Sequence, residues 1–310
     1  MHFSLQLPTD RVEAGEEFVG FEAVAEVSRA AEAAGFDAVF VTDHPFAPDR
    51  WLAEGGHQAL DPFVVLSTAA AATRRLRVQT HILVAGYRNP FLTARAAASL
   101  DVLSGGRLLL GMAAGYLRGE FRALGVDPDE RNELADEAIR AIRAAWTGQS
   151  VRFRGRHFEA RGNTMLPQPV QRPGPPILVG GNSRRAIRRA VELGDGWVPF
   201  PSPKTFAPHV RTAAVETLED LARRIDYARE HAERVGRTAP LEISFSPLSL
   251  TVYGRGDYEP GALRDEIAAL TDLGVGRLTL GLRGRNRGEL LDAIARFGEE
   301  VIAPVNRELG

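Results

Sequence analysis

The sequence predicts an α/β fold, a (β/α)₈ TIM barrel that runs over residues 1–310 as one domain and carries an insertion after the fourth helix. Eight short aliphatic or β-branched runs alternate with segments of helical period, which is the pattern of repeated βα units. The runs are continuously apolar, as in parallel strands buried on both faces. One such barrel also suits the chain length. An open doubly wound sheet would need a glycine-rich turn after the first strand, where residues 8–10 read Pro-Thr-Asp.

The expected strands are the apolar runs at residues 3–7, 37–42, 76–84, 107–113, 176–180, 196–200, 242–253 and 277–282. Between them, apolar side chains recur at helical spacing, most clearly at residues 24–34, 92–103, 135–146 and 290–301. Gly35, Gly105 and Gly148 follow the first three of these stripes, as expected of residues that end helices.

One stretch, residues 151–171, interrupts the alternation. It places Phe153, His157 and Phe158 among arginines and continues into Leu-Pro-Gln-Pro at residues 166–169. Such a sequence is typical of a β-hairpin followed by an irregular return. We therefore expect a hairpin-like insertion here and not a domain boundary.

Composition excludes several classes of function. Lys+Arg number 38 and Asp+Glu 40, a formal net charge of −2, without the basic excess of a nucleic-acid binder. No run reaches the ~20 apolar residues of a membrane span, and the first residues lack the basic region of a signal peptide, so we expect a cytoplasmic protein. Cys is absent, which removes thiolate catalysis, and a Schiff-base lysine would have to be Lys204, the only lysine.

The first candidate site residues follow the second expected strand. Active sites of such barrels lie at the carboxyl ends of the strands, and Asp43 and His44 stand directly after the run at 37–42. An imidazole in the barrel mouth would suit proton transfer near neutral pH. The alternative is a loop turn, in which Asp43 accepts hydrogen bonds from backbone amides and Pro45 stiffens the exit.

Two further strand ends carry candidates. His81, in the third run, either lines the pocket or packs at the top of the barrel. After it, Asn89 before Pro90 predicts a helix N-cap. After the fourth run, Gly111 and Gly115 would permit close approach of a planar ligand, and Tyr116 would supply a hydroxyl and a ring, although a tight turn also favours glycine.

The fifth run ends in a candidate anion site. Gly180 and Gly181 lead through Asn182 and Ser183 into a helix that begins with arginines, Arg184 first. Free amides and the positive end of a helix dipole favour a phosphate at such a place, and the polar side chains would add donors. The alternative is an ordinary Asn/Ser cap on a solvated helix.

Other chemistries find little support. No cluster of histidines and carboxylates has metal-ligand spacing, so we expect no metal site. The Gly-x-Ser-x-Gly turn of serine acyl transfer is also missing. An anion site, a glycine-lined slot and a histidine in one barrel mouth together suit a phosphorylated planar cofactor.

The sequence as a whole resembles the luciferase-like flavin and deazaflavin oxidoreductases. The resemblance covers most of residues 1–200 in order. It rests on the segments 36–44 (FDAVFVTDH), 89–107 (NPFLTARAAASLDVLSGGR), 111–131 with Gly111 to Tyr116, Glu120-Phe121 and Arg131, 146–148, 155–158, 175–183 (PPILVGGNS) and 194–197. It is most similar to the branch that uses coenzyme F420, an 8-hydroxy-5-deazaflavin with a polyglutamate tail.

This resemblance implies a barrel, usually dimeric, with the deazaflavin at its carboxyl face. It implies that Asp43 and His44 lie by the ring, with His44 as the proton-transfer residue. His81-Ile82 matches a position where the family often has a non-proline cis peptide behind the ring. Gly115 and Tyr116 match a ring-binding slot. Tyr116 stands where some sugar-phosphate dehydrogenase relatives carry a catalytic carboxylate.

The resemblance further implies that Gly180, Gly181, Asn182 and Ser183 hold the phosphate, and Arg184 is placed to meet the anionic tail. The expected function is hydride transfer between coenzyme F420 and a small organic substrate, by a homodimer without metal, nucleic acid or membrane partners. The alternative is a monooxygenase that uses reduced FMN and oxygen. Substrate contacts are expected from residues 44–60, from the insertion at 151–171 and from the region after 200.

Overall fold

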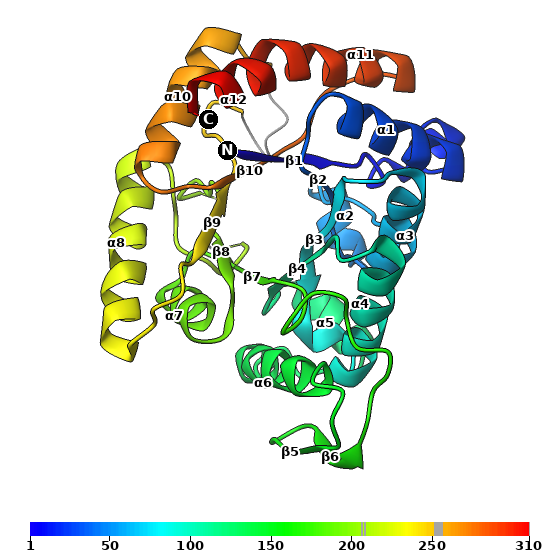
Figure 1. The fold of residues 1–310 in the computed structure, drawn as a ribbon, viewed down its shortest axis with the longest axis vertical. Coiled ribbons are helices and arrows are strands. Elements are labelled where there is room, and N and C mark those ends of the chain that lie inside the picture. Colours follow the sequence, from blue (N-terminus) through cyan, green and yellow to red (C-terminus); the bar gives the residue numbers. More distant parts are fainter. Residues whose placement is uncertain (206, 208, 251–256, 310) are drawn as a thin grey trace.

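The computed structural model describes residues 1–205, 207, 209–250 and 257–309. Eight parallel strands close into a barrel, in which each strand pairs with the next one and β10 pairs with β1 (Figure 1). The barrel strands are β1 (His2–Gln6), β2 (Ala38–Val41), β3 (Arg77–Val84), β4 (Leu108–Ala113), β7 (Ile177–Gly180), β8 (Gly196–Val198), β9 (Glu242–Phe245) and β10 (Arg277–Leu280). The predicted (β/α)₈ barrel is therefore confirmed.

Each strand lies within its predicted run, apart from β1, which begins one residue early. The run at 242–253 was too long: β9 ends at Phe245, and residues 251–253 lie outside the described residues. Pro247 explains the early end, because proline has no N–H to donate to a sheet.

The helices form the outer ring of the barrel (Figure 1). The main ones are α1 (Phe21–Ala33), α3 (Pro62–Ala72), α4 (Pro90–Ser104), α6 (Arg131–Ala145), α7 (Arg184–Leu193), α8 (Leu218–Val235), α10 (Pro260–Asp272) and α11 (Arg287–Phe297). The described residues also form the short helices α2 (Asp49–Ala53), α5 (Arg118–Ala123) and α12 (Ala303–Leu309). None of the helices in the described part of the chain is both long and apolar enough to cross a bilayer.

Local sequence sets the helix ends as expected. The Asn89 side chain accepts a hydrogen bond from the amide of Phe91 (2.9 Å), and Pro90 takes the first helical position of α4. At the other end, Gly105 adopts a left-handed conformation (φ 69°), which ends the helix at low steric cost. The predicted cap at Asn89 is confirmed.

The insertion is an antiparallel hairpin of β5 (Val151–Arg154) and β6 (Glu159–Asn163). Glu137 of α6 accepts hydrogen bonds from the backbone amides of His157 and Phe158 and from His157 Nδ1 (2.9 Å). The hydrogen bond that His157 donates to Glu137 raises the pKa of this histidine. The hairpin lies beyond α6 at the periphery (Figure 1), and its contact with the substrate stays a prediction.

The inside of the barrel has two different halves. Ala38, Leu109, Leu178 and Val198, from β2, β4, β7 and β8, form an apolar cluster separate from the core between strands and helices. On the other side, β1, β3 and β10 contribute the buried polar residues Ser4, Gln79 and Arg277. Hydrogen bonds connect the side chains of this side from Arg277 through Ser4 to Gln79.

Candidate active site

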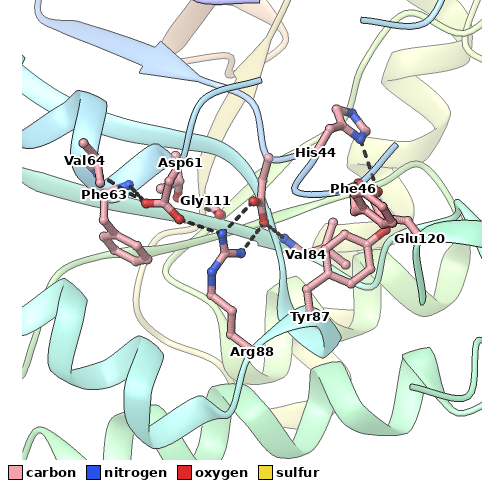
Figure 2. Close-up of polar contacts among 12 residues, drawn as sticks. His44, Phe46, Asp61, Phe63, Val64, Val84, Tyr87, Arg88, Gly111 and Glu120 are labelled. Carbon is pink, nitrogen blue, oxygen red and sulfur yellow. Dashed lines mark hydrogen bonds and ion pairs between the residues drawn. The ribbon is translucent and has the colours of Figure 1, made fainter. Parts of the chain in front are cut away.

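The carboxyl end of the barrel brings His44 together with a buried carboxylate (Figure 2). His44 follows β2, and its Nδ1 lies 3.4 Å from Oε2 of Glu120 on α5. Glu120 also accepts hydrogen bonds from the Tyr87 hydroxyl (2.7 Å) and the Phe46 amide (3.0 Å). Its side chain is wholly buried, and that of His44 is 11% exposed. The imidazole is thus fixed on one edge by a carboxylate.

The protonation states in this cluster follow from its hydrogen bonds. Burial alone would raise the pKa of Glu120, but the hydrogen bonds from His44, Tyr87 and Phe46 lower it below its ordinary value. Burial and the nearby Glu120 raise the pKa of Tyr87, so the phenol stays protonated and donates. Because an ionised carboxylate only accepts, Nδ1 of His44 carries a proton, and Nε2 remains for exchange with a ligand.

Aromatic rings pack against His44 on its other side. The ring of Trp51, on α2, lies 4.5 Å from that of His44 between centroids. His57 lies 4.9 Å from His44, nearly perpendicular to it, and 5.4 Å from Trp51. These rings limit the access of water to the imidazole, which suits controlled proton transfer.

Asp43 is buried in an ion pair. Its two carboxylate oxygens accept hydrogen bonds from Arg88 (2.7 and 2.9 Å), and one also accepts from the Val84 amide (3.1 Å). Arg88 also donates to Asp61, the cap of α3 (3.1 Å; Figure 2). Burial alone would lower the pKa of Arg88, but its bonds to the two carboxylates raise it. Asp43 thus joins the ends of β2 and β3 and fixes the backbone next to His44.

His81 and Ile82 lie at the end of β3, and the peptide bond between them is cis, as the resemblance implies. The His81 ring packs 4.5 Å from that of Phe40, and its Nδ1 lies 3.3 Å from Nε2 of Gln79. Burial lowers the pKa of His81 to about 4, so this imidazole is neutral at physiological pH.

The glycines of the mouth serve packing within the chain. A Cβ on Gly111 would lie 2.0 Å from the Thr80 carbonyl oxygen. One on Gly115, which has φ 77°, would lie 2.5 Å from Val84, and one on Gly180 would lie 2.2 Å from Ile82. Packing between the strands is thus sufficient reason for glycine at these positions, and close approach of a ligand at Gly111 and Gly115 stays a prediction. Next to Gly115, Tyr116 is half-buried.

The start of α7 differs from expectation in one residue. Ser183 caps the helix by accepting from the Ala186 amide (3.2 Å). Gly181 has φ 119°, which favours glycine. The Asn182 side chain, however, donates to the carbonyls of Phe200 and Ala213 (both 2.9 Å) and is 1% exposed. It anchors the segment after β8 and is not a free phosphate donor.

Three backbone amides, those of Ser183, Arg184 and Arg185, have no acceptor among the described residues. They stand at the positive end of a ten-residue helix, where an anion is stabilised. Arg184 lies 5.2 Å above the Tyr227 ring, and Arg185 pairs with Glu133 (2.9 Å). An anion here would therefore be held mainly by backbone amides.

Four arginines gather near this helix start, two of them paired with carboxylates: Arg118 with Asp129 (2.6 Å) and Arg185 with Glu133. Burial, and next the charge of Arg211, lower the pKa of Arg131 at the start of α6. Arg118 and Arg185 lower it further, so all of these guanidinium groups share one neighbourhood. In the part of the chain that is described, by contrast, no group of three or more His, Asp or Glu side chains could hold a metal ion.

Sequence reasoning missed the roles of Glu120 and Arg88. Glu120 was noted only within a resembling segment, and Arg88, directly before the predicted cap at Asn89, was not singled out. Their partners are 76 and 45 positions away, so no local pattern reveals the pairs. One signal was available: a carboxylate such as Asp43, at the end of a buried strand, requires a counter-charge.

Comparison with known proteins identifies the family. The sequence model of the luciferase-like monooxygenases matches residues 1–259. The chain belongs to the luciferase-like monooxygenase family. A protein of Mycobacterium tuberculosis H37Rv, described as uncharacterized, is 30% identical over 294 residues, which are 90% of this chain and 94% of that protein.

Two further relatives of this luciferase-like chain differ in cofactor. The FMNH₂-dependent dimethylsulfone monooxygenase of Pseudomonas putida is 34% identical over 174 residues, 55% of this chain and 46% of that enzyme. The structure of the coenzyme F420-dependent tetrahydromethanopterin reductase of Methanopyrus kandleri superposes with a TM-score of 0.74 at 17% identity, over 98% of this chain and 99% of that one. The second likeness concerns the fold alone.

Removal of Arg88 tests the buried pair. Arg88→Met leaves the Asp43 carboxylate buried without its counter-charge, so the free energy of unfolding in urea should fall by about 2–4 kcal/mol. Arg50→Met, which breaks an exposed pair with Glu54 (2.8 Å), should leave it nearly unchanged. Equal effects of the two substitutions would contradict this role of Arg88.

Proposed function

We propose that the protein is an oxidoreductase that transfers a hydride between coenzyme F420 and a small organic substrate, with His44 moving the accompanying proton. The observation that carries the proposal is the pairing of His44 with the ionised Glu120 beside Trp51. A deazaflavin supplies two electrons as hydride, so the protein has to supply one proton and a slot shielded from water. Hydride and proton together complete a two-electron reduction.

In this proposal His44 exchanges a proton through Nε2, while Glu120 holds the ring in place at Nδ1. Tyr87 and the Phe46 amide keep Glu120 ionised and in place. Asp43 orients the loop through Arg88 and is not itself a proton donor.

The same proposal places the ring between the ends of β3 and β4, against His81-Ile82, Gly115 and Tyr116. The phosphate would lie at the start of α7, after Gly180, Gly181 and Asn182. It would be held by the backbone amides of Ser183, Arg184 and Arg185. The donor set fits an anion there because those amides have no other described acceptor. The arginines around Arg131 favour a cofactor whose tail carries several carboxylates.

A second candidate is an FMN-dependent monooxygenase, in which reduced FMN from a separate reductase reacts with oxygen. The 34% identity with the dimethylsulfone monooxygenase favours it. FMN also has a phosphate for the start of α7, but it has no polyglutamate tail for the arginine-rich region.

Cofactor titration separates the two candidates. The purified protein is titrated with coenzyme F420 and with FMN, both followed by fluorescence. We expect saturable F420 binding that Arg131→Ala weakens at least several-fold, because it removes positive charge from the tail site. FMN affinity should be nearly unaffected by this substitution. Tight FMN binding without any response to F420 would refute the first candidate.

His44→Ala tests the proton-transfer role. Turnover should fall ~10²–10⁴-fold, the usual contribution of a general acid or base, while the dissociation constant of the cofactor changes little. His2→Ala, at an exposed histidine that pairs with Asp37, is the matched control and should leave turnover unchanged. Unchanged turnover in His44→Ala would remove the proposed role.

We also propose a homodimer through the face of α3, α4 and residues 166–170. This face exposes Val64 (68%), Leu92 (69%) and Leu103 (77%), with Leu166 and Val170 beside them. Monomeric proteins rarely leave so many large apolar side chains together in water. Leu103→Glu should shift the mass measured by light scattering toward the monomer, whereas Val235→Glu, on α8, should not. A monomeric wild-type protein would contradict the proposal.

A further inference from the structure

The polar half of the barrel interior forms one continuous chain of hydrogen bonds that ends at His81. Arg277 of β10 donates from Nη1 to the Ser4 hydroxyl of β1 (3.2 Å). Ser4 donates to Oε1 of Gln79 on β3 (3.2 Å), and Nε2 of Gln79 lies 3.3 Å from Nδ1 of His81. Ser4, Gln79 and Arg277 are all at most 1% exposed.

The direction of this chain is set at its first member. Arg277 cannot accept a hydrogen bond and stays charged, and Glu242 holds its Nε (2.7 Å). Ser4 therefore accepts from Arg277, and its single proton is directed to a second partner. The described partner is Oε1 of Gln79, which turns the other end of that amide, the NH₂ group, toward His81.

The tautomer of His81 follows from this direction. A neutral imidazole has one N–H and one acceptor nitrogen, and Nδ1 accepts from Gln79. The proton therefore resides on Nε2. Among the residues that the structure describes, Nε2 has no hydrogen-bond partner and does not count among the buried unpaired atoms.

We propose that the Arg277–Ser4–Gln79 chain fixes His81 as a neutral hydrogen-bond donor that presents its Nε2–H to an acceptor atom of the ligand in the barrel mouth. The acceptor would be an oxygen or ring nitrogen of the bound cofactor or of the substrate. That ligand rests on the proposed function, whereas the tautomer does not. His81 is then a binding residue, and Gln79, Ser4 and Arg277 are positioning residues.

The surroundings of His81 favour an imidazole that stays neutral near pH 7 and donates through Nε2–H. Its pKa is lowered by burial, and no charged group contributes to the shift. Phe40 covers the ring from β2 (4.5 Å). The charged residues Arg77, Glu242 and Arg277 stand at the first positions of β3, β9 and β10, whereas His81 lies in the second half of β3. The mouth thus holds a histidine next to a carboxylate, His44, and a histidine next to an amide, His81.

The tautomer is measured directly in the full-length protein without cofactor. Long-range ¹H–¹⁵N correlation spectra of ¹⁵N-histidine-labelled protein distinguish the two neutral tautomers and the imidazolium form. The His81 signal is assigned by its loss in His81→Phe. We expect the Nε2–H tautomer throughout pH 6–8. An Nδ1–H tautomer, or an imidazolium at pH 7, would overturn the proposal.

A substitution at Gln79 tests the origin of the tautomer. In Gln79→Glu, a carboxylate that only accepts faces Nδ1, so His81 should switch to the Nδ1–H tautomer or become protonated at neutral pH. Ser246→Ala removes another hydroxyl of the interior, which contacts Thr279 (3.0 Å) and not this chain, and should leave the spectrum of His81 unchanged. A wild-type tautomer in Gln79→Glu would show that Gln79 does not set it. If that variant does not fold, the wild-type spectrum alone still decides the tautomer.

The ligand contact is tested by binding. His81→Phe keeps an aromatic ring but lacks the donor, and should weaken coenzyme F420 or FMN, whichever the wild-type protein binds, roughly 2- to 10-fold. Unchanged affinity would overturn the contact while the tautomer stands. If neither cofactor binds the wild-type protein, the proposed function fails, and the spectra still decide the tautomer.

Discussion

The ion pair between Asp43 and Arg88 is the constraint on which the rest of the candidate site depends. It joins the ends of two adjacent strands, β2 and β3, and also reaches the cap of α3 through Asp61. Because Asp43 precedes His44 directly, the pair also fixes where the imidazole can lie. Burying such charges costs desolvation energy that the pairing only partly repays. The ion pair therefore serves to fix the backbone next to His44 in one conformation.

The barrel was predictable because its signals are local. A strand buried on both faces is apolar at consecutive positions, and helices end at glycines, so each element is visible within about ten residues of sequence. The pairs that build the site are not local. Glu120 meets His44 across 76 positions, and neither residue looks unusual within its own segment. Only the closure of the barrel brings them together. The sequence alone therefore predicts where the site lies better than it predicts which of its side chains are in contact.

Some local patterns have two physical explanations. Glycine admits a ligand or admits a neighbouring strand, and at Gly111 and Gly115 the chain's own atoms fill the space. An asparagine before a helix can donate to a bound anion or to the backbone of a loop. The side chain of Asn182 donates to the loop carbonyls of Phe200 and Ala213. Burial decides between the two purposes in each case, and burial depends on segments distant in sequence. The amides at the start of α7 escape this ambiguity, because helix geometry itself leaves them without partners.

The two histidines of the mouth show how the fold gives one side chain two different chemistries. His44 faces a carboxylate, which fixes its Nδ1 edge and leaves Nε2 toward the barrel mouth. His81 faces an amide whose orientation is set by an arginine two hydrogen bonds away, and burial keeps it neutral. A site that moves a hydride and a proton needs its proton source to be unique, because a second titrating group nearby would compete for the same proton. The buried chain behind His81 removes that competitor while it retains a donor to hold the ligand.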